Sequence, residues 1–179
     1  FNKKQSLKHL MGYVSQDDIL IEELTVFQNL YFNAQLLFKG KSKLELQKLV
    51  LRTLQDVGLS DCKDLRVGNV LDKTISGGQR KRLNIALELM REPEVLFVDE
   101  PTSGLDPNQI IEIRNVIKSE GEGKTVLFSS HILQEVEAIC DRVIIINKGV
   151  IVANDTIKNL KGSSGNLENI FRELTTTTL

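Results

Sequence analysis

Strand-like and helix-like segments alternate in the second half of the chain, and this alternation limits the possible folds more than any other feature. Asp106 and Pro107 open one helix as its N-cap and first residue, and residues 132–140 form another. Short runs rich in Val, Ile, Leu and Phe flank these helices, at 95–98, 125–129 and 142–146. A turn at Lys148 and Gly149 leads from the last run into a further strand. Apolar strands separated by helices indicate a parallel α/β sheet.

Helix signals dominate the first half, after a short strand expected at 10–15. Thr25 precedes apolar residues at helical spacing. Ser42 and Glu45 form a capping-box pattern for a second helix, and Gly58 supplies its stop. We expect these segments to form a helical lobe. At the other end of the chain, a flexible link at 162–165 and a short helix at 167–174 are expected.

Charge and composition exclude several classes of partner. The net charge is −1 and the pI is about 6.2, which does not suggest a surface for nucleic acid or anionic lipid. No apolar run approaches the roughly 20 residues that cross a bilayer. The cysteines Cys62 and Cys140 lie far apart, which fits a reducing compartment and structural roles. The basic cluster Arg80 to Arg82 either adds positive field beside the helix start at Ser76 or, as such runs more often do, forms a solvated helix face.

Two carboxylates, Asp99 and Glu100, end the strand predicted at 95–98. In an open α/β sheet, ligands bind at the carboxyl ends of the strands. Acidic residues placed there can hold Mg²⁺ and orient a water molecule for attack. Solvated acids at a strand end would give the same pattern, so this pair alone leaves both interpretations open.

A turn with two glycines begins a third helix. Ser76 and Gln79 have the capping-box spacing, and Gly77 and Gly78 let the backbone approach a ligand closely. The free N–H groups and the positive dipole end of such a helix favour an anion. An ordinary loop with an N-cap is the alternative interpretation of this turn.

Two other polar residues follow predicted strands. His131 comes directly after 125–129 and is placed to hydrogen-bond a phosphate oxygen. Gln16 follows the strand at 10–15, and its amide is able to ligate a metal or position a water molecule. Structural roles are the alternative for both. His9 has no such setting and receives no role.

Taken together, these residues closely resemble the ABC ATPase family over about residues 10–155, in the family's order of motifs. Ile75 stands where the family usually has Leu. The matching motifs are YVSQD at 13–17 (Q-loop), ISGGQRKRL at 75–83 (signature), VLFVDEP at 95–101 (Walker B with the catalytic glutamate), TSGLD at 102–106 (D-loop) and Ser130–His131 (switch histidine).

This resemblance implies ATP and Mg²⁺ as cofactors and a role for each matching residue. Asp99 would help hold Mg²⁺, Glu100 would polarise the attacking water, and His131 would contact the γ-phosphate. Gln16 would sense both the Mg²⁺ and the water. Asp106 would couple the two sites of a dimer. The residues that would close on nucleotide held by the second subunit are Ser76, Gly77, Gly78 and Gln79. Positioning and charge stabilisation supply most of the catalysis in phosphoryl transfer.

One family motif has no counterpart in the 179 residues, the phosphate-binding pattern G-x-x-x-x-G-K-[ST]. Gly123, Lys124 and Thr125 come nearest, but Lys118 stands where the first glycine belongs. They also lie between Walker B and the switch histidine, the wrong place for this loop. We expect an N-terminal truncation, and therefore poor ATP binding and almost no hydrolysis by this chain alone.

The resemblance implies a P-loop NTPase-like α/β core, incomplete here, with an inserted α-helical lobe. The expected parts are a core at 1–16 and 93–155, a lobe carrying the signature motif at 17–92, and a C-terminal linker with a short helix at 156–179. The implied partners are a transmembrane permease subunit or domain and a second nucleotide-binding subunit. The protein would then lie peripherally at the cytoplasmic face of a membrane.

The leading hypothesis is the ATPase subunit of an exporter, because the signature helix is similar to those of G-type half transporters and related exporters. A soluble ABC ATPase of translation or DNA repair is one alternative. A non-catalytic fragment that serves only in protein interaction is another.

Overall fold

The computed structural model describes residues 10–69, 74–162 and 166–176. The chain divides into two compact units, residues 1–129 and residues 130–179. The division expected from the sequence, into a core at 1–16 and 93–155, a lobe at 17–92 and a C-terminal part at 156–179, stays a prediction.

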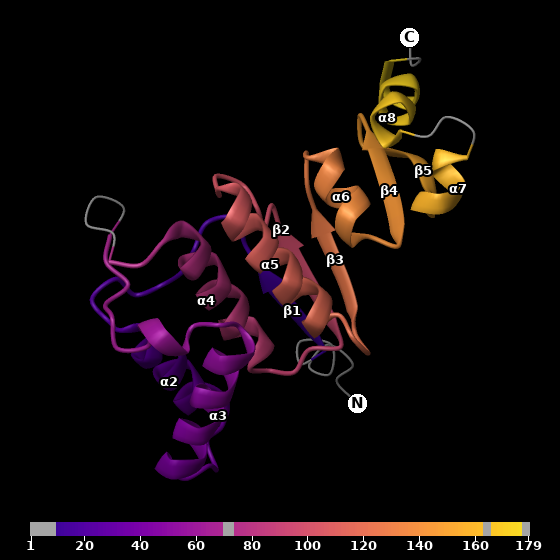
Figure 1. Ribbon diagram of the computed structural model, residues 1–179. Helices are drawn as coiled ribbons and strands as arrows, with labels where there is room; N and C mark the ends of the chain where they lie inside the picture. The colour runs from indigo at the N-terminus through magenta and orange to yellow at the C-terminus, as the bar shows by residue number, and fades with distance from the viewer. Residues whose placement is uncertain (1–9, 70–73, 163–165, 177–179) are drawn as a thin grey trace, which may run out of the picture. The chain divides into compact units, whose positions relative to one another are not determined.

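A three-stranded parallel sheet in the order β1-β2-β3 forms the centre of the first unit (Figure 1). Its strands are β1 (Met11–Val14), β2 (Val95–Asp99) and β3 (Thr125–Ser129). On the central strand, Leu96 and Val98 are buried. The predicted α/β class with a parallel sheet is confirmed for these strands. Since parallel strands end at the same edge, the residues that follow them gather there.

The helices described in this unit begin where the sequence places their caps. Ser42 and Ser76 form the predicted capping boxes, Thr25 forms another, and the Asp106 side chain caps its helix. Gly58 adopts a φ of 65° just after the second helix, as its predicted role as a stop requires. The helices are α2 (Val26–Leu37), α3 (Lys43–Asp56), α4 (Gly77–Leu89) and α5 (Pro107–Glu120), with a 3₁₀ turn η1 at Ser60–Cys62.

The basic cluster on α4 is buried, so the predicted solvated face was wrong. Arg80, Lys81 and Arg82 are only 8%, 9% and 9% exposed. The reason is the position of α4, which packs against the lobe helices α2 and α3, against β1 and against α5 (Figure 1). Neighbouring elements therefore cover its second turn, and backbone carbonyl and carboxylate oxygens receive the three cations.

In the second unit, a β-hairpin joins three helices among the described residues. They are α6 (Leu133–Ile139), β4 (Arg142–Asn147), β5 (Val150–Thr156), α7 (Ile157–Lys161) and α8 (Leu167–Thr176). The helix expected at 167–174 is confirmed, whereas α7 was not predicted from the sequence. Thr156 caps α7 by accepting the Asn159 N–H at 3.2 Å. Part of the link expected at 162–165 lies outside the described residues.

Strand β4 corrects the sequence-based sheet. It was expected in the parallel sheet, but it pairs antiparallel with β5. Lys148 and Gly149 both have positive φ, 50° and 78°, as a two-residue hairpin turn between right-twisted strands requires. The apolar run at 142–146 could not distinguish the two pairings, since both place Val and Ile in a strand. Among the described residues, each helix is too short or too polar to serve as a membrane span.

Candidate functional site

Several predicted site residues meet at the carboxyl edge of the parallel sheet. Gln16 follows β1, Asp99 ends β2, and Glu100 comes directly after it. The pairing of Val14 with Val98, and of Asp99 with Ser129, brings the three strand ends together. His131 belongs to the second unit.

The Asp99 carboxylate is held by hydroxyl groups from both neighbouring strands. The Ser129 hydroxyl donates to Oδ1, and the Tyr13 hydroxyl donates to Oδ2 at 3.5 Å. The same Ser129 oxygen accepts the Glu100 N–H at 3.1 Å. Ser129 therefore links the two acidic residues, although the sequence motifs gave it no role in the site. Its place at the end of the strand next to β2 was the signal that could have identified it.

Glu100 has a backbone conformation that is rare for its residue type. Its φ is 42°, in the left-handed region that side chains with a Cβ seldom adopt. Such a conformation costs about 1–3 kcal/mol and persists only where the surrounding structure enforces it. The hydrogen bond from its N–H to Ser129 is one such constraint. Glu100, to which the family resemblance gives the water-activating role, is thus one of the described non-glycine residues with a positive φ, together with Glu92 and Lys148.

The residues at this edge fit a magnesium ion that is held largely by a nucleotide. No group of three or more His, Cys, Asp or Glu residues within the described ranges forms a metal cluster. Mg²⁺ is commonly bound through one or two carboxylates together with substrate phosphates and water. Asp99 offers one such carboxylate, and the exposed Gln16 side chain follows the adjacent strand. These few donors suit a Mg²⁺ ion that is bound together with nucleotide phosphates. They are too few for a metal site built from protein ligands alone.

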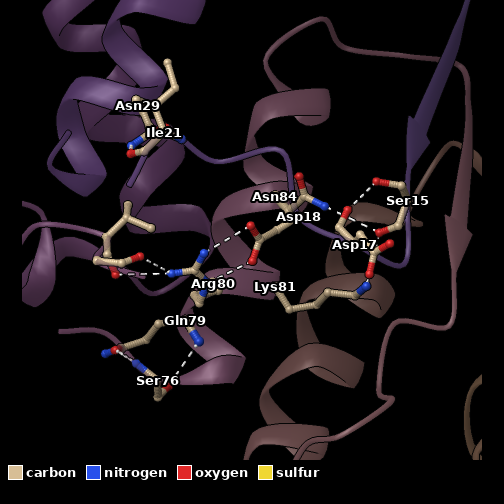
Figure 2. Close-up of polar contacts among 12 residues, drawn as sticks. Ser15, Asp17, Asp18, Ile21, Asn29, Ser76, Gln79, Arg80, Lys81 and Asn84 are labelled. Atoms are coloured by element: carbon tan, nitrogen blue, oxygen red, sulfur yellow. Dashed lines mark hydrogen bonds and ion pairs between the residues drawn. The ribbon is translucent and has the colours of Figure 1, made fainter. Parts of the chain in front are cut away.

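The glycine turn that opens α4 is closed by reciprocal hydrogen bonds. The Ser76 hydroxyl accepts the Gln79 N–H at 3.1 Å, and the Gln79 side chain accepts the Ser76 N–H at 2.8 Å (Figure 2). The Gly78 N–H donates to the side-chain oxygen of Gln109 on α5 at 3.1 Å. The backbone of Gly78 thus faces α5, and the N–H groups of Ser76, Gly78 and Gln79 already have acceptors within the chain.

Asp106 fixes the helix turn from which Gln109 reaches the backbone of Gly78. Its carboxylate accepts the N–H groups of Asn108 at 2.9 Å and of Gln109 at 3.0 Å, which fixes the first turn of α5. The predicted coupling role of Asp106 across a dimer remains a prediction. Within one chain, Asp106 orders the helix whose side chain contacts the glycine turn.

We expect Gly78→Ala to destabilise the protein by about 1–3 kcal/mol, the usual cost of overpacking a core. An added Cβ would lie 2.9 Å from the Gln109 Cγ and 3.0 Å from its Cβ. The change to alanine would otherwise favour a helix by about 1 kcal/mol, so a loss would identify the contact with α5. Thermal unfolding of the purified variant measures it.

Gly77→Ala is the matched control for that substitution. Its added Cβ would approach the Leu105 Cδ2 at 3.3 Å, the end of a flexible side chain that is able to shift. A smaller loss than for Gly78→Ala is expected. Equal losses would show that the glycines serve the turn itself and not the packing against α5.

In the second unit, His131 is exposed and precedes α6. It lines an open groove together with other residues of the α6 start and residues of α8. Those residues are Ile132, Leu133, Gln134, Glu168, Phe171, Arg172 and Thr175. The predicted contact of His131 with a γ-phosphate is not tested by this arrangement and stays a prediction.

Comparison with known proteins decides the family. The family model described as ABC transporter matches residues 1–103. The chain belongs to the ABC transporter family. The resemblance inferred from the motifs, including the likeness to G-type proteins, is therefore confirmed, and with it the ATP-binding and ATPase character of the family.

Curated relatives of this ABC chain are much longer than the chain itself. It is 38% identical over 144 residues to ABC transporter G family member 13 of Arabidopsis thaliana, covering 79% of this chain and 21% of that protein. It is 32% identical over 160 residues to ABC transporter A family member 1 of Dictyostelium discoideum, covering 89% and 17%. It is 36% identical over 154 residues to the linearmycin resistance ATP-binding protein LnrL of Bacillus subtilis, covering 86% and 47%.

Proposed function

We propose that the protein to which this chain belongs hydrolyses ATP with Mg²⁺ to drive export across a membrane. The observation that carries the proposal is the sheet edge, where Ser129 links Asp99 and Glu100 beside the segment that follows β1. In this proposal the edge places two carboxylates on adjacent residues, Asp99 to bind the metal and Glu100 to activate the water. Export is favoured because the relatives include G-family transporters and a protein named for resistance.

Each residue takes a defined part in this proposal. Asp99, with Gln16, holds the Mg²⁺, which supplies neutralisation of the phosphate charge when bound. Glu100 accepts a proton from the attacking water, and His131 donates a hydrogen bond to the γ-phosphate. The 179 residues contain no G-x-x-x-x-G-K-[ST] pattern, so a phosphate cradle of that type would be supplied from outside them.

The glycine turn would serve nucleotide held by a second nucleotide-binding subunit. Ser76 and Gln79 bond to one another, and Gly78 bonds to Gln109, so a phosphate entering the turn must replace or share these bonds. We propose a transmembrane permease subunit or domain as the other partner, which would hold the chain at the cytoplasmic face of the membrane.

The direct test of this function is a nucleotide titration. The full-length protein is expected to bind ATP saturably in the presence of Mg²⁺ and to hydrolyse it, whereas residues 1–179 alone are expected to bind it more weakly. Isothermal titration and phosphate release measure the two properties. Absence of both from the full-length protein would refute the proposal. Equal affinity of the two proteins would show that residues 1–179 suffice for binding.

Ser129→Ala is expected to weaken Mg²⁺-dependent nucleotide binding by about 1.5–3 kcal/mol, the usual worth of a hydrogen bond to a charged group. The variant removes the donor to Asp99 and the acceptor of the Glu100 N–H. Equilibrium binding of a fluorescent ATP analogue measures the change. Ser119→Ala is the control, because that hydroxyl donates only to the Val116 carbonyl on α5. Similar losses for both serines would contradict the role of Ser129.

A further inference from the structure

Lys81 is a buried lysine whose three bonding partners are backbone carbonyls. It lies in the second turn of α4 and is 9% exposed. Its Nζ donates to the carbonyl oxygens of Gln16 at 3.0 Å, Ser15 at 3.2 Å and Asp99 at 3.4 Å. Figure 2 shows the side chain extending from α4 toward the segment that follows β1. An ammonium group has three N–H donors, so these three carbonyls match its capacity.

Burial removes water from the charged Lys81 ammonium group, which costs free energy that an exposed lysine does not incur. Desolvation lowers the pKa of Lys81, although Asp99, Asp18, Asp17 and Glu100 act in the opposite direction. The cation is thus stabilised by carbonyl oxygens in contact and by carboxylates at longer range.

The three carbonyls lie just beyond the pairing of β1 with β2. The register of β1 with β2 runs from Met11 opposite Val95 to Val14 opposite Val98. Ser15, Gln16 and the carbonyl of Asp99 come after the last of these pairs. Lys81 therefore supplies a link between the two chain segments just beyond the point where the β-ladder holds them.

Its neighbours on α4 make different connections. Arg80 pairs with Asp18 and donates to the Gly68 carbonyl. Arg82 pairs with Glu112 and donates to the Gly58 carbonyl. Both arginines are as buried as Lys81. Arg80 reaches the segment after β1 at Asp18, but within the described part of the chain it makes no bond to Gln16 or Asp99, and the partners of Arg82 lie on α5 and just after α3. Of the three cations, Lys81 is the one that reaches the predicted magnesium-binding residues.

We propose that Lys81 is a positioning residue, which fixes the backbone of Gln16 relative to that of Asp99 and thereby sets the affinity of the site for Mg²⁺ in the nucleotide complex. This inference rests on the proposed function for its consequence, but the structural link stands without nucleotide. Because Lys81 projects from the helix that begins with the glycine turn, it also joins that helix to both strand ends.

The test compares Lys81→Met with Arg82→Met in the full-length protein. Binding of a fluorescent ATP analogue is measured over a range of Mg²⁺ concentrations. Lys81→Met is expected to require about tenfold more Mg²⁺ for half-saturation, as loss of a residue that supports a metal ligand typically does. Arg82→Met removes an equally buried cation from the same helix, and it is expected to lower the melting temperature without changing the Mg²⁺ requirement.

Hydrogen exchange without nucleotide is the second measurement. Lys81→Met should speed amide exchange in residues 15–18 and 99–101, whereas Arg82→Met should speed it near residues 57–59. Equal shifts in Mg²⁺ requirement for both variants, or no shift and no faster exchange for Lys81→Met, would overturn the inference. If Lys81→Met does not fold, Lys81→Gln must show the same two changes. A wild-type protein that binds no nucleotide would refute the proposed function, and the exchange comparison would still decide the role of Lys81.

Discussion

Glu100→Gln is expected to lower the kcat for ATP hydrolysis by the full-length protein about 10²- to 10⁴-fold, the usual contribution of a positioned general base. The amide has the same shape as the carboxylate but cannot accept a proton from the attacking water. Asp99 and the Ser129 link remain, so nucleotide binding should persist. The expected product is a protein that holds ATP and Mg²⁺ without turnover. Phosphate release and retention of labelled ATP measure the two parts of this result.

Glu92→Gln provides a closely matched control. Glu92 is also a glutamate in the left-handed region, with a φ of 49° compared with 42° for Glu100. It is exposed and lies between α4 and β2, at the opposite end of that strand. Hydrolysis by Glu92→Gln should equal that of the wild type. Unchanged hydrolysis by Glu100→Gln, or an equal loss in both variants, would contradict the assigned role of Glu100.

The strain at Glu100 extends this prediction to stability. Glycine adopts positive φ without a steric cost, so Glu100→Gly should raise the free energy of unfolding by about 1 kcal/mol while abolishing hydrolysis. A variant that is more stable and inactive would indicate that the protein retains a strained residue for catalysis. Destabilisation by Glu100→Gly would indicate that the Glu100 carboxylate makes a contact that stabilises the fold by more than the backbone strain costs.

Local signals explain why most elements could be predicted from the sequence. The side chains of Ser42, Ser76 and Asp106 bond to backbone N–H groups within three residues, so the pattern that predicts each helix start is also its physical cause. The same holds in part for β2, whose apolar run buries Leu96 and Val98 on one face and leaves Val95 and Phe97 half-buried on the other. The site residues Asp99 and Glu100 could be located because they directly follow that strand.

Features that depend on distant segments could not be predicted in this way. The sequence of Arg80 to Arg82 suggests a solvated helix face. Their burial follows only from the packing of α4 against α2, α3, β1 and α5. The bond between Gly78 and Gln109 joins residues 31 positions apart, and the link from Ser129 to Asp99 joins residues 30 apart. Strand β4 could not be assigned to a sheet because its partner, not its own sequence, decides the pairing.

The buried cluster leads to the largest expected effect on stability, which is that of Arg80→Met. Arg80 donates to both carboxylate oxygens of Asp18, at 2.8 and 3.1 Å, and to the carbonyls of Gly68 and Val67 at 2.6 and 3.3 Å (Figure 2). Its side chain is 10% exposed and that of Asp18 is 28% exposed. Methionine fills a similar volume but leaves a carboxylate and two carbonyls without their donor. We expect a loss of about 3 kcal/mol, as for other broken buried ion pairs.

A double-mutant cycle with Asp18→Asn separates the ion pair from the packing around it. The sum of the two single losses in unfolding free energy should exceed the loss in the double variant by about 1–3 kcal/mol. The reason is that the carboxylate left unpaired in Arg80→Met is absent once Asp18 is replaced by Asn. The exposed pair Arg52 and Asp56, 4.0 Å apart with side chains 84% and 50% exposed, is the control, and its coupling should stay below about 0.5 kcal/mol. Equal coupling in both pairs would mean that burial adds nothing to the Arg80 contact. In that case the cost of Arg80→Met would come from the lost bonds to the Val67 and Gly68 carbonyls and from packing, not from the ion pair with Asp18.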